Sequence, residues 1–208
     1  MALLIYRAIL SVALGACLAS FVWGMRNVFV LPSHPTSGMK LTALSGAVVG
    51  LLNFGVILAS ATLLTSLVCG ALSLYLVALG LFWWSAHAGC GRHLPACFTK
   101  IEPSGLVTNG PYRFVRHPFY VSYMTVWAAG AVATLSPWLI SAFLLMSLVY
   151  VSAALTEEKA LLNGIHSTEY LHYRNRTSMF IPRPEWMKAK NLQARNADPA
   201  SLNLPRYY

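Results

Sequence analysis

Five long apolar runs, separated by short polar segments, dominate the pattern of this chain. They cover approximately residues 3–24, 41–63, 67–87, 119–134 and 137–156. A helix needs about 20 apolar residues to cross roughly 30 Å of hydrocarbon. The fourth run is short and would need local thinning of the bilayer. The pattern predicts an all-α, polytopic membrane protein with about five transmembrane helices. A composition that is 57% hydrophobic and 10% charged agrees.

The connections between the apolar runs predict how the helices follow one another. No proline or glycine-rich loop divides the second run from the third, which predicts a very tight helical hairpin there. Ser136-Pro137 makes the fourth and fifth helices antiparallel neighbours. Gly46, Gly50 and Gly55 offer small-residue surfaces for close packing of the second helix.

The basic residues predict an orientation in the membrane. The first apolar run has no basic segment before it, so we interpret it as a retained helix and not as a cleaved signal peptide. With the N-terminus outside and the C-terminus cytoplasmic, the uncharged turns lie outside and most cations lie inside. Only Arg7 falls on the outer side, where it is expected to snorkel to the headgroups. The formal charge of +9 therefore needs no nucleic-acid partner. The cations placed inside are Arg26, Lys40, Arg92, Lys100, Arg113, Arg116 and those of the tail from Lys159 to Arg206.

Composition divides the chain into three parts. Residues 1–87 hold the first three helices, and residues 186–208 form a basic polar tail. Residues 88–185 form a core, which comprises a cytoplasmic loop, a helical hairpin over 119–156 and a C-terminal amphipathic helix from Thr156 toward Tyr173. The loop holds Pro95, Pro103 and Pro111 and is expected to be irregular.

His87, Cys90, His93 and Cys97 form a candidate metal-ligand set in this loop. The residue types suit zinc, but their spacing matches no zinc pattern, so we predict no metal site. The two loop cysteines are expected on the reducing side of the membrane, which argues against a disulfide framework.

The densest polar and aromatic stretch is 104–120, directly before the fourth apolar run. Pro118 suits the first turn of a helix and disfavours helical geometry at His117, which is therefore held at the mouth of the helix. Tyr120 follows three residues later, and Tyr112 can approach from the loop. An interfacial aromatic belt with basic anchors is the alternative. The combination favours a binding site, since ionisable groups at a membrane edge are costly.

Two later elements are expected at the same edge. Glu157-Glu158 directly follows the fifth run, and the hairpin places the pair on the side of His117. Adjacent helical residues point about 100° apart, so at most one glutamate is expected to face the loop. A solvated helix start is the alternative. Tyr170 and Tyr173 share a helix face, either on an amphipathic helix resting on the membrane or on a lid over a cofactor.

These elements together resemble a known family. The run from Gly105 to Tyr120 is similar to the signature of the isoprenylcysteine carboxyl methyltransferases, which are related to the phospholipid methyltransferases. Glu157-Glu158-x-x-Leu161 and the segment from Tyr170 to Pro182 follow in the family's order. The resemblance covers about residues 80–183.

The resemblance implies methyl transfer from S-adenosylmethionine to a lipophilic small-molecule or lipid-modified acceptor within the membrane. Tyrosine faces can attract the sulfonium of this cofactor, and a glutamate can accept its hydrogen bonds. The transfer mainly needs alignment. The implied catalytic residues are His117, Arg116 and Glu158. The implied cofactor-binding residues are Ser104, Gly105, Leu106, Val107, Tyr112, His117, Pro118, Phe119, Tyr120, Glu157, Glu158, Tyr170 and Tyr173.

The identity of the methyl acceptor stays open at this point. Isoprenylcysteine enzymes carry an arginine one helical turn before the key glutamate, where this chain has Ala154. A carboxylate acceptor would lose a bidentate partner there. A phospholipid amine and another small hydrophobic acceptor are the alternatives to an isoprenylcysteine carboxylate. A non-enzymatic transporter or assembly factor is a further alternative, although the spans show no mid-membrane acids or bases and no inverted repeat.

Overall fold

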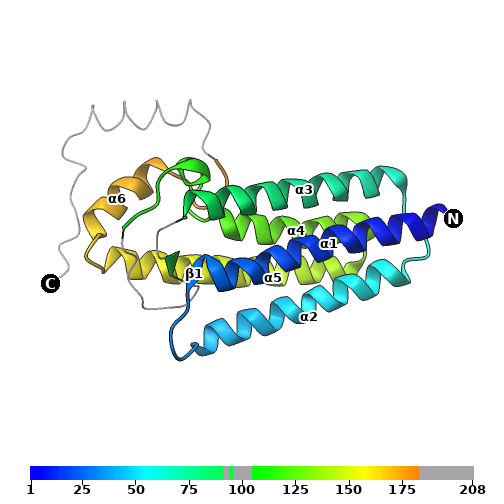
Figure 1. Cartoon of the computed structure of the whole chain (residues 1–208), viewed down its shortest axis with the longest axis horizontal. Helices are drawn as coiled ribbons and strands as arrows, with labels where there is room; N and C mark the ends of the chain where they lie inside the picture. Colours follow the sequence, from blue (N-terminus) through cyan, green and yellow to red (C-terminus); the bar gives the residue numbers. More distant parts are fainter. Residues whose placement is uncertain (91–93, 96–104, 183–208) are drawn as a thin grey trace.

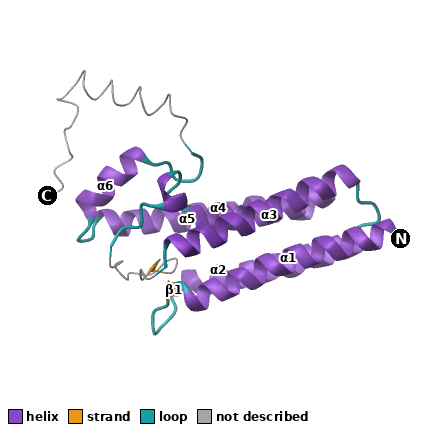
Figure 2. Ribbon diagram, turned by 45° about the horizontal axis from the view of Figure 1, so that its top comes forward, coloured by secondary structure: helices purple, strands orange, loops and turns teal. Residues whose placement is uncertain are grey.

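A computed structural model describes residues 1–90, 94–95 and 105–182 of the chain. Within these residues, five long helices run along a common direction and form a bundle, and a sixth, shorter helix lies across one end (Figures 1 and 2). The helices are α1 (Ala2–Asn27), α2 (Ser37–Ala59), α3 (Thr65–Ala88), α4 (Pro118–Thr134), α5 (Pro137–Leu162) and α6 (Ser167–Arg176). The predicted all-α fold is confirmed.

Four of these helices, α1, α2, α3 and α5, are long and apolar enough to cross a membrane. Helix α4 has 17 residues and is shorter than these four. The chain is thus an integral, multi-pass membrane protein. The α2–α3 connection is short, as predicted, because α2 ends at Ala59 and α3 begins at Thr65.

Short elements complete the end of the bundle that carries α6. Strand β1 (Phe29–Val30) follows α1 and pairs in parallel with β2 (Leu94–Pro95), so that Phe29 lies opposite Leu94. A single 3₁₀ turn, η1 (Gly110–Arg113), precedes α4. The connections that carry these elements bring the ends of α1 and α3 beside the start of α4.

Helix α4 lies at the centre of the packing, between α3, α5 and α2. It approaches α2 closely at Gly130, where a Cβ atom would lie 1.9 Å from the Asn53 side-chain oxygen. Of the three glycines predicted to make close contacts, only Gly50 does so, against Leu18. Gly46 and Gly55 have no neighbouring atom within 4 Å of a Cβ position. The prediction was wrong for these two, whose Cβ positions face open space.

At the other end of the bundle, Arg7 differs from the expectation that it would snorkel to the headgroups. Its guanidinium does not reach outward to headgroups but donates to the carbonyl of Ser60, with Nη2 at 2.6 Å. Ser60 is the C-terminal cap of α2. Arg7 therefore places a cation where the last carbonyls of a helix carry partial negative charge.

The C-terminal helical region also differs from the prediction. Helix α5 does not end near residue 156 but continues to Leu162, and a turn around Asn163 and Gly164 separates it from α6. The expected single helix from Thr156 to Tyr173 is wrong because Asn and Gly favour a turn there. The glutamate pair therefore lies inside α5, before its last turn. The predicted tail, 186–208, lies outside the described residues, and the division into three parts stays a prediction.

Candidate functional site

The segment before α4 is held in place by its pairing with the chain that follows α6. The Arg116 N–H donates to the Ser178 carbonyl at 2.8 Å, and the His117 N–H donates to the Met179 carbonyl at 3.2 Å. Pro118 then begins α4, as predicted, with His117 as the residue before its first turn. The side chains of residues 116 and 117 are thereby fixed at the mouth of the helix.

Glu158 binds three basic groups. It is 3% exposed, and its Oε1 atom lies 2.8 Å from both Nε and Nη2 of Arg116. The same oxygen lies 3.2 Å from His117 Nε2, and Oε2 lies 3.4 Å from Arg174 Nε. Charge-assisted bonds of this kind are the strongest hydrogen bonds available to side chains. Glu158 thus joins α5, the start of α4 and α6.

Most N–H groups of the Arg116 guanidinium already have partners among the described residues. Its Nε and Nη2 atoms bind Glu158, and Nη1 donates to the carbonyl of Thr177 and, at 3.2 Å, to that of Arg174. Both carbonyls belong to the end of α6 and the residue after it. The guanidinium therefore ties α6 to the bundle.

Glu157 contacts different partners. The Tyr120 hydroxyl donates to its Oε1 atom, and His117 Nδ1 lies 3.6 Å from its Oε2 atom. The expectation that at most one glutamate would face the loop was wrong. His117 lies between the two carboxylates and presents one ring nitrogen to each, so two side chains that diverge from α5 both reach the segment 116–120.

A cavity of about 160 Å³ opens beside Glu157. It is lined by residues from the loop, α4, α5 and α6, while Glu158 lies behind its wall. Of the predicted cofactor-binding residues, Ser104 lies outside the described residues. The predicted residues that line the cavity are Gly105, Leu106, Val107, Tyr112, Arg116, His117, Pro118, Phe119, Tyr120, Glu157, Tyr170 and Tyr173.

Five lining residues were not predicted. Met25 and Phe29 come from the end of α1 and from β1, and Leu94 comes from β2. Nothing in the sequence connects these segments to the site, since the β1–β2 pairing brings them there. Tyr123 and Leu161 could have been found, because Tyr123 is three residues after Tyr120 and Leu161 is four after Glu157.

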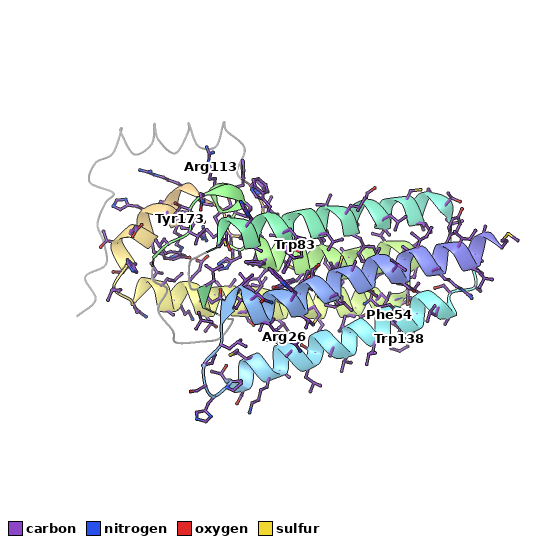
Figure 3. All side chains as sticks on the ribbon, viewed as in Figure 1. Arg26, Phe54, Trp83, Arg113, Trp138 and Tyr173 are labelled. Carbon is purple, nitrogen blue, oxygen red and sulfur yellow. The ribbon has the colours of Figure 1, made fainter. Side chains whose placement is uncertain are left out.

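Helix α6 covers one side of the cavity, which favours the lid interpretation over a helix that only rests on the membrane. The Tyr173 hydroxyl donates to the Tyr112 carbonyl at 2.7 Å. Figure 3 shows Tyr173 on α6 at the same end of the molecule as Arg113, far from Trp138. Burial raises the pKa of Tyr112, Tyr170 and Tyr173 above its ordinary value. The three hydroxyls therefore stay protonated and able to donate at neutral pH.

The candidate metal-ligand set cannot be compared in full. His93 and Cys97 lie outside the described residues, so the prediction of no metal site stays a prediction. Within residues 1–90, 94–95 and 105–182, no group of three or more metal-ligand side chains comes together.

The fold and the site together define a multi-pass membrane protein with a cavity of acidic and aromatic side chains at one end of its bundle. Residues 68–168 match the phospholipid methyltransferase family. This segment runs from α3 into the start of α6 and contains Arg116, His117 and both glutamates. Over these residues the chain is similar to this family, whose methyl donor is S-adenosylmethionine. The resemblance seen in the sequence is confirmed.

A curated relative agrees with this assignment. The chain is 38% identical over 80 residues to a protein of Schizosaccharomyces pombe named Protein-S-isoprenylcysteine O-methyltransferase. The aligned part is 37% of this chain and 33% of the relative. The chain thus spans about a third of the length of the curated relative that it matches.

Proposed function

We propose that this protein transfers a methyl group from S-adenosylmethionine to a lipophilic acceptor at the edge of the membrane. One observation carries the proposal. The Glu157 carboxylate and several tyrosines converge on one cavity, which lies where apolar helices end and the polar loop and α6 begin. A polar cofactor from the aqueous phase and an acceptor from the bilayer can both reach such a position.

The residues around the cavity fit the cofactor. Bound S-adenosylmethionine supplies a methyl group activated by a positively charged sulfur. The rings of Tyr112, Tyr120 and Tyr173 line the cavity and can contribute cation–π attraction. Glu157 can accept hydrogen bonds from ribose hydroxyls or an amino group. Tyr170 also lines the cavity, and its protonated hydroxyl can donate a hydrogen bond.

The two glutamates have different proposed roles. Glu157 faces the cavity and is the residue we expect to touch the ligands. Glu158 and Arg116 hold α6 and the start of α4 in place, and we assign them positioning roles. Methyl transfer depends mainly on alignment of the reacting groups and on exclusion of water. Helix α6 covers one side of the cavity and so supports both the alignment and the exclusion of water.

For the acceptor, we propose an amine, as in a phospholipid headgroup, over a carboxylate. A carboxylate needs a cation to bind it, and the charge of Arg116 is already paired with that of Glu158. Ala154, where the resemblance implies an arginine, is fully buried in α5. An amine must instead lose a proton, and Glu157 is the carboxylate of the cavity that can accept it. The similarity to the S. pombe protein keeps an isoprenylcysteine carboxylate as the second candidate.

The first prediction concerns cofactor binding. Purified protein in detergent should bind S-adenosylhomocysteine in isothermal calorimetry with a Kd on the order of micromolar. Glu157→Ala should weaken this binding about tenfold or more, because a charge-assisted hydrogen bond contributes about 1.5–3 kcal/mol. Glu169→Ala is the matched control, since Glu169 is an exposed glutamate of α6 that does not line the cavity. Folded wild-type protein that does not bind would favour a transporter or an assembly factor.

The second prediction concerns the acceptor. Membranes containing the protein, supplied with methyl-labelled S-adenosylmethionine, should label phosphatidylethanolamine or its methylated products. Added farnesylcysteine should stay unlabelled, because Arg116, the arginine among the described lining residues, is already paired with Glu158 and does not hold a second carboxylate. Label that appears in farnesylcysteine as a base-labile methyl ester would contradict the amine proposal and establish the carboxylate acceptor. In both cases Glu157→Ala supplies the background rate.

A further inference from the structure

A column of aromatic rings extends from the cavity into the bundle between α4 and α5. The rings of His117 and Tyr120 are stacked with centroids 5.6 Å apart and planes 19° apart. The ring of Tyr150, from α5, is also stacked with Tyr120, with centroids 5.5 Å apart and planes 19° apart. Tyr150 is 5% exposed and is not among the cavity-lining residues.

Tyr150 is enclosed by one face of α4. Trp127 Nε1–H donates to the Tyr150 hydroxyl at 3.2 Å, and this indole is 2% exposed. Tyr123 contacts the Tyr150 ring with centroids 5.6 Å apart. Residues 120, 123 and 127 follow the spacing of a single helix face. A buried tyrosine needs a partner for its hydroxyl, and Trp127 provides one in the apolar interior.

The same column ends at the carboxylate of the cavity. Tyr120 is stacked on Tyr150 through its ring and donates to Glu157 through its hydroxyl. Glu157 lies seven residues after Tyr150 on α5, which is two helical turns along the same face. Tyr120 is thereby held at two points by one helix, and both its ring and the Glu157 carboxylate line the cavity.

We propose that Tyr150 is a positioning residue, which is oriented by Trp127 and holds Tyr120 and Glu157 in the geometry that binds the cofactor. This inference rests on the proposed function. It assigns a role in binding to a pair of side chains deep in the bundle that do not touch the cavity. A leucine at position 150 could fill comparable apolar space, but it would offer Tyr120 no flat surface and Trp127 no acceptor.

The test measures S-adenosylhomocysteine binding by calorimetry in four variants. Trp127→Phe and Tyr150→Phe remove the same hydrogen bond from opposite sides, and each should weaken binding about threefold to tenfold, the range expected for one buried hydrogen bond. The double variant should lose less binding than the sum of the two single losses, because both changes remove the same Trp127–Tyr150 hydrogen bond. Tyr150→Leu also removes the stacked ring and should weaken binding further, by about tenfold or more.

Tyr75→Phe is the matched control. Tyr75 is 1% exposed in α3, and its hydroxyl has no hydrogen-bond partner among the described residues. Its removal should leave the Kd unchanged. The thermal unfolding midpoint of each variant is measured without ligand. It shows whether a variant that binds weakly is still folded.

The possible outcomes separate the two proposals. If the wild type does not bind, the proposed function fails. If the wild type binds and Tyr150→Leu binds with the same Kd, the positioning role alone is overturned. It is also overturned if the losses in Trp127→Phe and Tyr150→Phe simply add in the double variant, because the two side chains would then act independently.

Discussion

At the scale of single residues, the two adjacent glutamates of α5 differ in what surrounds them. Glu158 is buried against Arg116 and His117, so its charge is matched by the Arg116 guanidinium within the protein. Glu157 has the Tyr120 hydroxyl as a neutral donor and borders the cavity. A helical rotation of about 100° between neighbours is the physical reason for the difference.

This difference predicts separate effects on stability. Glu158→Gln should lower the free energy of unfolding by about 3 kcal/mol or more, because it leaves the buried Arg116 guanidinium without its counter-charge. Glu157→Gln keeps an acceptor for Tyr120 and should cost about 1 kcal/mol or less. Thermal unfolding in detergent, without ligand, would compare the two variants. Equal losses would contradict the assignment of Glu158 to positioning and Glu157 to binding.

At the scale of elements, the sequence predicts most of the boundaries of α4 and α5. It does not predict how these helices pack. Pro118 and Pro137 each begin a helix as their sequence context predicts. The extension of α5 through the glutamates to Leu162 was not foreseen, because a change from apolar to polar residues was interpreted as a helix end. Polar residues can continue a helix beyond the membrane without a break.

Packing between elements depended on contacts that no local pattern encodes. Gly130 allows α4 to approach Asn53 of α2, although it lies in a run of small residues with no special signal. Gly46 and Gly55 had a more suggestive spacing and make no close contact. Which face of a helix meets a neighbour is decided by the whole bundle.

At the scale of the whole molecule, the helix order places the site and most cations at the same end. Helices α1, α3 and α5 end there, and α2 and α4 begin there. Arg26, Lys40 and Arg113 lie at or near these helix ends. We propose that this end is cytoplasmic, following the positive-inside rule.

The orientation predicts which engineered cysteines react in intact cells. In a chain whose four native cysteines are replaced by alanine, Ser136→Cys, between α4 and α5, should react with a membrane-impermeant maleimide. Asn163→Cys, in the turn after α5, should react only after the membrane is permeabilised. The reverse pattern would place the site outside the cytoplasm.

The sequence alone determined the membrane class, the helical hairpins and the family resemblance, because length, hydropathy and proline positions act locally. It also identified most cavity-lining residues, since they fall in a contiguous loop and at helix ends close by along the chain. Only the tertiary structure decided that Glu157 borders the cavity while Glu158 binds Arg116, and that Tyr150 stands behind Tyr120. Those outcomes depend on how α4, α5 and α6 rotate against one another. That rotation comes from packing over the whole bundle, which no segment specifies by itself.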